Sequence, residues 1–281
     1  MKFKSIIPKL DLKGPNLIKP IFLEGLRVLG KPEEYAQHYF DGGCDEIIVH
    51  DAVAQLLDKL VSLDSIKKIS EKIFVPITVG GGIRSIADIK KILQSGASKI
   101  SINSHALKKP NFINDAADVF GSSVISVSID VGRVENNYYA FLINGRECSG
   151  KNPIDWAKEV EERGAGEIIL TSIENEGNGE GYNIPLIKKI SESVNIRVIA
   201  NGGAGTINDI LNLFKKTNVD AASLSSMLHY SLLNKYKNFT AYKEEGSKAF
   251  LEKKNFRFKN FNNFFIKNIK EDLKKEKINL R

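Results

Sequence analysis

The most constraining feature of this chain is a regular alternation of short apolar runs with helix-like stretches. The apolar runs lack strict polar alternation, which suits strands buried on both faces. Amphipathic stretches such as IADIKKILQSG and IDWAKEVEERG separate them. The eight runs are SIIPKL (5–10), EIIVH (46–50), VPITV (75–79), SKISI (98–102), SVISVSI (123–129), EIILT (167–171), IRVIA (196–200) and DAASLS (220–225). Eight such units predict an α/β fold, a (β/α)8 barrel, with a doubly wound open sheet as the alternative.

The composition favours one domain, and the sequence has no P-loop or GxGxxG motif, so we expect no cofactor. A chain of 281 residues with 42% hydrophobic residues can bury a large core, and no linker-like stretch divides it. We expect a single barrel over 1–281, with half-barrels at about 1–121 and 122–240. Residues 241–281 then form a C-terminal extension that includes the last helix.

Several classes of protein are disfavoured. No run of 18 apolar residues or signal peptide is visible, so we expect no membrane partner. Two isolated cysteines and four histidines without ligand spacing indicate a reducing cytoplasm and no metal. The net charge is +7, but residues 251–281 carry ten Lys+Arg against four Asp+Glu, which is +6 of it. Positive charge confined to one end is not typical of a nucleic-acid enzyme.

The two halves of the chain repeat each other. CDEIIVHD (44–51) resembles AGEIILTS (165–172), TVGGGI (78–83) resembles IANGGAG (199–205), and KISINS (99–104) resembles AASLSS (221–226). Asp11 and Asp130 end the first and fifth apolar runs. All four pairs lie 119 to 122 residues apart, which indicates a barrel built from two similar halves.

The repeat predicts two phosphate sites. Gly-Gly turns after the third and seventh strands expose backbone N–H groups, and Asn103-Ser104 and Ser225-Ser226 follow the fourth and eighth strands before a helix. One such glycine pair is usually only a tight turn. Two copies at matched positions favour a long ligand with a phosphate at each end.

Asp11 and Asp130 are the candidate catalytic pair. Both follow strands at the carboxyl end of the barrel, where barrel enzymes hold their active sites. Two opposed carboxylates can serve as general acid and general base if their environments separate their pKa values. Capping or a loop hydrogen bond is the simpler explanation for a single aspartate. Two long connections, 12–30 and 131–152, start at the same end, and YYAFLI in the second is predicted to form a hairpin strand.

In order, KLDLK, DEIIVHD, TVGGGI, GASKISINS, SVSID, RGAGEIILTSI and IANGGAG resemble the cyclase subunit of imidazole glycerol phosphate synthase over residues 4–230. The resemblance implies an enzyme that takes ammonia from a separate glutaminase subunit. It converts phosphoribulosyl formimino aminoimidazole carboxamide ribotide, a bisphosphate, to imidazole glycerol phosphate and aminoimidazole carboxamide ribotide in histidine biosynthesis.

The resemblance also assigns residues. Asp11 and Asp130 match the catalytic pair, Lys19 matches a lysine that reaches the substrate, and Thr171 a central polar residue. Three members of a charged ring that gates ammonia are matched by Glu46, Lys99 and Glu167. The first phosphate site is matched by Gly82, Asn103 and Ser104. The second phosphate site is matched by Gly177, Gly203, Ser225 and Ser226.

Three positions depart from the family pattern. The gate usually has an arginine where this chain has Ser5, which leaves two acids and one base. Lys9 stands where the family commonly has a small thiol, and a lysine there would favour ionised Asp11. Glu176 replaces an aspartate near the second phosphate.

The first loop, KGPNLIKPIFLEGLRVLG, resembles a branch of the family associated with surface-polysaccharide genes. That resemblance implies an alternative, in which the barrel conducts ammonia to a sugar amidotransferase and does little chemistry itself. The related barrel isomerase of histidine synthesis is a third possibility, which the gate residues disfavour. Near the C-terminus, Phe265, Ile269 and Leu273 recur on one helix face. We expect that helix to dock on the barrel, and 238–262 is a candidate partner surface.

Overall fold

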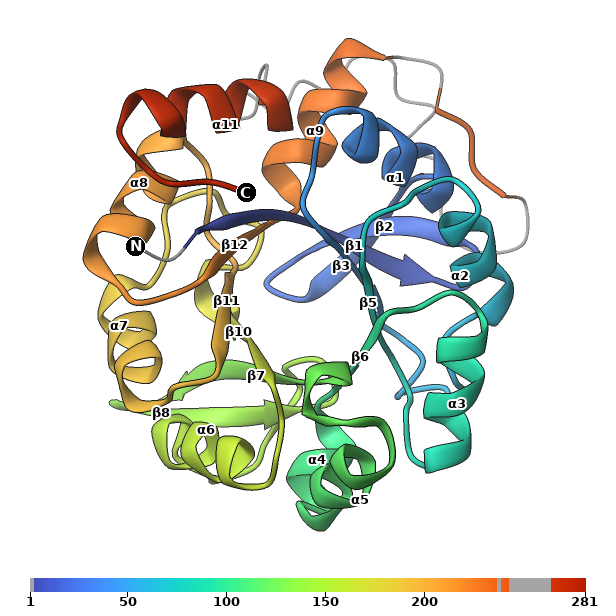
Figure 1. The fold of residues 1–281 in the computed structure, drawn as a ribbon, viewed down its shortest axis with the longest axis vertical. Coiled ribbons are helices and arrows are strands. Elements are labelled where there is room, and N and C mark those ends of the chain that lie inside the picture. Colours follow the sequence, from blue (N-terminus) through green and yellow to red (C-terminus); the bar gives the residue numbers. More distant parts are fainter. Residues whose placement is uncertain (1–2, 237–238, 243–263) are drawn as a thin grey trace.

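A closed barrel of parallel strands forms the centre of the protein in the computed structural model, which describes residues 3–236, 239–242 and 264–281 (Figure 1). The eight barrel strands are β1 (Ser5–Lys13), β4 (Ile47–Asp51), β5 (Ile77–Gly80), β6 (Lys99–Ile102), β7 (Ile125–Val134), β10 (Glu167–Ser172), β11 (Arg197–Asn201) and β12 (Ala221–Leu224). Each pairs in parallel with its two neighbours, and the pairing of β1 with β12 closes the ring. The predicted (β/α)8 fold is confirmed, strand for strand.

Helices surround the barrel (Figure 1). They are α1 (Pro32–Asp41), α2 (Leu63–Ser70), α3 (Ile86–Gln94), α4 (Ser104–Lys108), α5 (Asn111–Phe120), α6 (Pro153–Glu162), α7 (Ile184–Ser193), α8 (Ile207–Lys216), α9 (Ser226–Lys235) and α11 (Ile266–Lys275). Short 3-10 turns lie at η1 (Ser122–Val124) and η2 (Ile173–Asn175). Side chains of Ser62, Ser85, Asn152 and Thr206 cap four of the helices by accepting backbone N–H groups, which fixes where those helices begin. In the described ranges, no helix has the length and apolar character needed to cross a bilayer.

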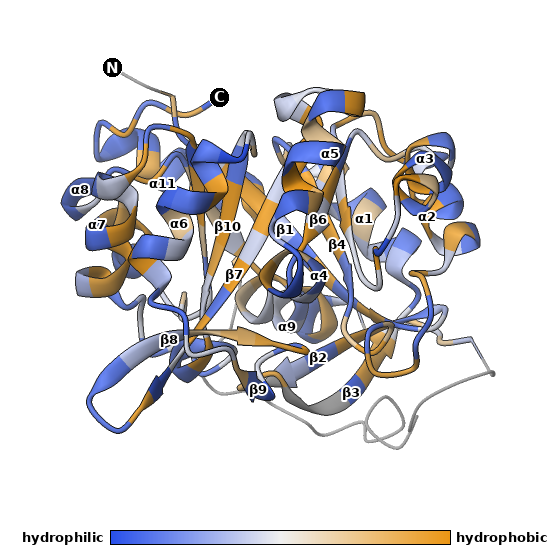
Figure 2. Ribbon diagram, turned by 90° about the horizontal axis from the view of Figure 1, so that it is seen from below, coloured by the Kyte–Doolittle hydropathy of each residue, from blue (hydrophilic) through white to orange (hydrophobic). Residues whose placement is uncertain are grey.

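Each half of the chain carries an antiparallel hairpin on its first strand. β1 continues past Asp11 to Lys13 and pairs with β2 (Asn16–Ile21), which pairs with β3 (Glu24–Gly30). β7 continues past Asp130 and pairs with β8 (Asn137–Leu142), followed by β9 (Glu147–Cys148). Figure 2 shows both hairpins at one end of the molecule, opposite the two termini. The predicted strand YYAFLI is confirmed, whereas 12–30, expected as a loop, is a hairpin.

The barrel interior is layered. Because side chains alternate along a strand, every second residue points inward. Near the strand starts, charged side chains of Glu46, Lys99, Glu167 and Arg197 meet. Above them lies an apolar layer of Ile7, Ile48, Ile169, Ile199 and Ala221. The outward faces of the strands pack with the helices in the main hydrophobic core. The polar candidate residues therefore gather above the apolar layer, at the hairpin end.

The C-terminal helix docks on the barrel as predicted. α11 buries Ile266, Ile269 and Leu273 and lies beside α8 and α9 (Figure 1). Phe265 occupies the N-cap position without a capping hydrogen bond from its side chain, and it is only partly buried. Leu280 then forms a bridge with Lys4. The predicted partner surface at 238–262 lies largely outside the described residues.

Candidate active site

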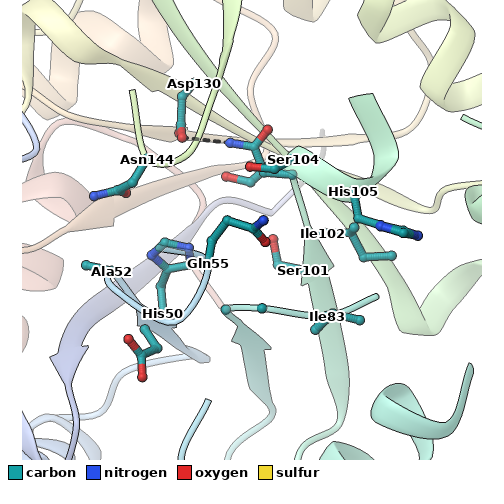
Figure 3. A pocket seen from close by; sticks show the side chains of 15 residues that line it. His50, Ala52, Gln55, Ile83, Ser101, Ile102, Ser104, His105, Asp130 and Asn144 are labelled. Carbon is teal, nitrogen blue, oxygen red and sulfur yellow. Dashed lines mark hydrogen bonds between the residues drawn. The ribbon is translucent and has the colours of Figure 1, made fainter. Parts of the chain in front are cut away.

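Three adjoining pockets lie at the hairpin end of the barrel. The first contains the predicted residues Gly82, Asn103, Ser104 and Asp130. Another contains Gly177, Gly203, Ser225 and Ser226. A central cavity is lined by Lys9, His50, Asp130 and Thr171. It shares His50 and Asp130 with the first pocket, which Figure 3 shows. The predicted phosphate residues of each half are thus brought together, on either side of a polar centre.

The glycines of the two Gly-Gly turns are required by close backbone approach. Gly82 and Gly203 have φ of 70° and 115°. A Cβ on Gly82 would lie 1.8 Å from the Lys59 carbonyl oxygen, and one on Gly203 would lie 2.1 Å from the Gly181 carbonyl oxygen. Only glycine fits both the backbone angle and the space. Both halves of the barrel therefore use a glycine with positive φ at the same kind of close backbone contact.

Hydrogen bonds occupy part of the first pocket. The Asn103 side-chain amide donates to Asp130 Oδ2 at 2.8 Å (Figure 3), and Ser104 Oγ accepts from the backbone N–H of Ile143 at 2.9 Å. Asn144, which sequence reasoning missed, follows Ile143 in a left-handed conformation with φ of 53° and lines both the first pocket and the central cavity. Its Nδ2 is buried and has no hydrogen-bond partner among the described residues. No local pattern around 144 signals this, because the hairpin turn places it.

The second pocket has free hydroxyls. Ser225 Oγ donates to the Lys9 carbonyl oxygen at 3.2 Å. The Oγ atoms of Ser223 and Ser226 are buried and make no hydrogen bond with any described residue. A buried hydroxyl without a partner loses the solvation it had in water, so such groups need a partner such as a bound ligand or water. The pocket therefore has donors available for an anion.

Two lysines hold Asp11 in its ionised form. Asp11 is buried, Lys9 Nζ donates to its Oδ1 at 2.5 Å, and Lys19 Nζ lies 3.6 Å from its Oδ2. Burial acts to raise the pKa of Asp11, but the ammonium of Lys9 and then that of Lys19 lower it to about 2. The expected effect of Lys9 on Asp11 is confirmed. Asp11 is a permanent anion near neutral pH.

Asp130 has the opposite environment. It is buried beside the same cavity, and burial raises its pKa to about 6 although Lys9 acts to lower it. Its neighbour Asn103 can donate to the carboxylate. The environments of Asp11 and Asp130 separate their pKa values, as a pair with different roles requires. Asp130 is the member that can exchange a proton near neutral pH.

The first hairpin closes over this centre through Lys19. The Lys19 side chain is fully buried, lies near Asp11 and donates to Glu176 Oε1. The backbone N–H of Phe22 donates to the Glu176 carbonyl oxygen at 2.9 Å. Glu176 also accepts from the Asn201 amide, which contacts Thr171 Oγ1 as well. Glu176 therefore connects the hairpin tip to β10 and β11, beside the second pocket.

The charged ring has four members, not the three that the sequence predicts. Arg197 at the start of β11 donates to Glu46 at 2.9 Å and to Glu167 at 2.6 Å. Lys99 donates to the same two carboxylates at 3.1 and 3.0 Å. The missing arginine at Ser5 is thus replaced from another strand. The run IRVIA contained the arginine, but only the barrel register shows that its side chain enters the ring.

Two of the four histidines, His229 and His50, lie beside the pockets. His229 is fully buried, its Nδ1 contacts the Tyr39 hydroxyl, and its Nε2 contacts Ser225 Oγ at 3.2 Å, so the structural role expected for it is confirmed. Among the described residues, no three His, Cys, Asp or Glu side chains are grouped to hold a metal. His50 lines the central cavity, and no role was predicted for it.

Comparison with known proteins decides the family. The family model described as histidine biosynthesis protein matches residues 5–234. The chain belongs to the histidine biosynthesis protein family. Relatives of this chain include proteins named imidazole glycerol phosphate synthase subunit HisF. The one from Legionella pneumophila is 46% identical over 205 residues, which is 73% of this chain and 97% of that protein.

Two other relatives cover more of the chain. The protein from Alkaliphilus metalliredigens is 42% identical over 229 residues, which is 81% of this chain and 91% of that relative. The protein from Natranaerobius thermophilus is 40% identical over 245 residues, 86% of this chain and 98% of the relative. The residues matched by the family model, 5–234, contain the eight barrel strands and the candidate site residues.

Proposed function

We propose that this protein is an enzyme, the cyclase subunit of imidazole glycerol phosphate synthase in cytoplasmic histidine biosynthesis. It would use ammonia to convert phosphoribulosyl formimino aminoimidazole carboxamide ribotide to imidazole glycerol phosphate and aminoimidazole carboxamide ribotide. The observation that carries the proposal is the pair of donor-rich pockets on either side of a cavity that holds Lys9, Asp130 and Thr171. A ligand with a phosphate at each end fits this arrangement.

The two aspartates receive different roles in this mechanism. Asp130, with its pKa near 6, gives and takes the protons of ring closure as a general acid and base. Asp11 remains ionised and stabilises positive charge that develops on the substrate. Backbone N–H groups near Gly82 and Gly203, with the hydroxyls of Ser104 and Ser226, hold the phosphates.

The charged ring is proposed as the entrance for ammonia. The ring lies at the opposite end of the barrel from the pockets, and the side chains of Lys99 and Arg197 are each 20% exposed there. A glutaminase subunit docked at that end would release ammonia onto the ring. Ammonia would then cross the apolar layer to the central cavity. The heterodimer with a glutaminase is therefore the proposed working assembly.

A second candidate is delivery of ammonia to a sugar amidotransferase. The observation that favours it is the ion pair of Lys9 with Asp11, because an aspartate with a pKa near 2 is a weak base. In that case the barrel conducts ammonia and its own chemistry is secondary. The two candidates differ in whether this chain alone consumes the ribotide.

A spectrophotometric turnover assay tests the proposal. Purified protein, the bisphosphate ribotide and ammonium are mixed at mildly alkaline pH without glutaminase. We expect turnover that disappears in Asp130→Asn, while the ribotide still binds through its phosphates. A folded wild-type protein that binds the ribotide without turning it over would contradict the cyclase and direct attention to the second candidate.

A further inference from the structure

His50 occupies the first position above the apolar layer on the inner face of β4. Glu46, Ile48 and His50 alternate with outward residues, so they share one face of the chain. Glu46 belongs to the charged ring and Ile48 to the apolar layer. His50 lines both the central cavity and the first pocket (Figure 3). A molecule that leaves the apolar layer along β4 therefore meets His50 first.

One nitrogen of the His50 imidazole is left unsatisfied by the described residues. Nδ1 is buried without a hydrogen-bond partner among the described residues, and the same is true of Asp11 Oδ2. Nδ1 lies 3.9 Å from Oδ1 of the same carboxylate, the oxygen that Lys9 binds, and this distance is too long for a hydrogen bond. One small donor can bridge a gap of this length, with each of its own contacts near 3 Å.

The backbone of the neighbouring strand leaves space for the His50 imidazole. A Cβ on Gly80, the neighbour of His50 in the β4–β5 register, would lie 3.0 Å from His50 Cδ2. Gly80 thus lets the imidazole lie flat against β5. Burial and then the charge of Lys9 lower the pKa of His50 to about 4, so the ring is neutral and one of its nitrogens is an acceptor.

The charges nearby select an uncharged donor. The ammonium of Lys9, bound to Asp11 Oδ1, is next to the gap and repels a second cation. Ammonia is uncharged and the size of water. It can donate N–H groups to a neutral imidazole and to a carboxylate while its lone pair stays free. This combination matches the two acceptors found here.

We propose that His50 accepts a hydrogen bond from ammonia as it leaves the apolar layer and, with Asp11, orients its lone pair toward the bound substrate. The contact is a hydrogen bond and changes no covalent bond. This role rests on the proposed function, because it assumes that ammonia is the nitrogen source. It makes His50 a binding residue for the nucleophile.

Steady-state kinetics of two His50 variants test this role. With ammonium as variable substrate and saturating ribotide, His50→Leu is expected to raise the KM for ammonia about tenfold, the loss of one hydrogen bond. The kcat and the KM for the ribotide should stay within about twofold. His50→Gln keeps an acceptor oxygen and should recover most of the loss. His38→Gln, on the outer helix α1, is the matched control and should match the wild type.

The opposite pattern would overturn the role. If His50→Leu lowers kcat and leaves the KM for ammonia unchanged, His50 does not hold ammonia. The same conclusion follows if His50→Gln is as impaired as His50→Leu. A gap filled only by water would also leave the KM for ammonia unchanged.

A binding measurement separates this role from the proposed function. In 15N-histidine-labelled protein, the Nδ1 resonance of His50, assigned by its loss in His50→Gln, should shift when ammonium is added at mildly alkaline pH. Tetramethylammonium, which has no N–H, should cause no shift. Absence of an ammonium-dependent shift would overturn the role of His50, whether or not the wild type turns over the ribotide. A shift without turnover would instead count against the cyclase alone.

Discussion

At the scale of single residues, two aspartates with opposite surroundings define the centre of the molecule. Asp11 is bound by a buried lysine, whereas Asp130 is buried with no ion pair to a lysine in the part of the chain that the structure describes. The sequence symmetry predicted the pair, and Lys9, two residues before Asp11, predicted the ionised state of Asp11. The sequence did not predict the raised pKa of Asp130, because that pKa depends on burial by residues from several strands.

The raised pKa of Asp130 should make the fold less stable as pH rises. Asp130 titrates near 6 when folded and near its usual value of 3.8 when unfolded. Its contribution is therefore present below about pH 4 and lost as pH rises through 6. The shift of about two units corresponds to about 3 kcal/mol. Urea unfolding of Asp130→Asn should show a stability gain over wild type that grows between pH 4 and 6 and is constant above. A pH-independent difference would contradict the assignment.

Removing Lys9 should destabilise the protein strongly. Lys9→Ala leaves the buried Asp11 carboxylate with only the more distant Lys19. Breaking a buried ion pair from one side costs roughly 3–5 kcal/mol. The free energy of unfolding at neutral pH, measured by denaturant titration, should fall by that amount. Lys90→Ala, at an exposed lysine on α3, should change it by less than about 0.5 kcal/mol. Equal effects of the two substitutions would argue against the ion pair.

At the scale of elements, the charged ring shows that strand register, which a linear motif does not give, decides which side chains meet inside the barrel. Glu46, Lys99 and Glu167 were predicted because they match members of the gate in the family that the sequence resembles. Arg197 was missed because its position in the ring depends on how β11 is staggered against β10, where Glu167 and Arg197 are paired. A charge lost from one strand was replaced on another.

An arginine on either β11 or β1 should therefore be able to stabilise the charged ring. Arg197→Ser removes hydrogen bonds to both Glu46 and Glu167, and the free energy of unfolding should fall by about 2 kcal/mol. Adding Ser5→Arg to this variant should restore part of the loss, because Ser5 also lies buried at the start of its strand. Thermal unfolding of the single and double variants measures the restoration. A double variant less stable than Arg197→Ser would show that β1 no longer has room for the side chain.

The first hairpin should open when its central ion pair is removed. Lys19→Met keeps the length of the buried side chain but loses the contacts with Glu176 and Asp11. Amide hydrogen exchange in β2 and β3 should then increase at least tenfold, with β5 and β6 unaffected. Lys13→Met, on the same hairpin but without an ion pair among the described residues, is the control and should leave exchange unchanged. Faster exchange throughout the barrel in Lys19→Met would indicate global destabilisation instead.

At the scale of the whole molecule, the repeat in the sequence corresponds to repeated construction. Each half supplies one extended strand with a hairpin, one close glycine contact and one pocket. The alternation of apolar runs was sufficient to predict all eight strands, because a parallel barrel buries both faces of each. The helices α2, α4, α8 and α9 and the first hairpin were not identified. α9 is buried over most of its length and so has no distinct apolar face, whereas α2 and α8 have clear apolar faces that could have been found.

The C-terminal helix should belong to the same cooperative unit as the barrel. α11 follows a long gap in the described residues, yet Leu273 is fully buried and Lys270 Nζ donates to Asp45 at 2.6 Å. Leu273→Ala should lower the stability of the whole protein by roughly 2–5 kcal/mol in a single transition. Lys274→Ala, next to it but exposed, should have little effect. If calorimetry of Leu273→Ala shows a separate early transition and an unchanged main one, the helix is an appendage, and the barrel is complete without it.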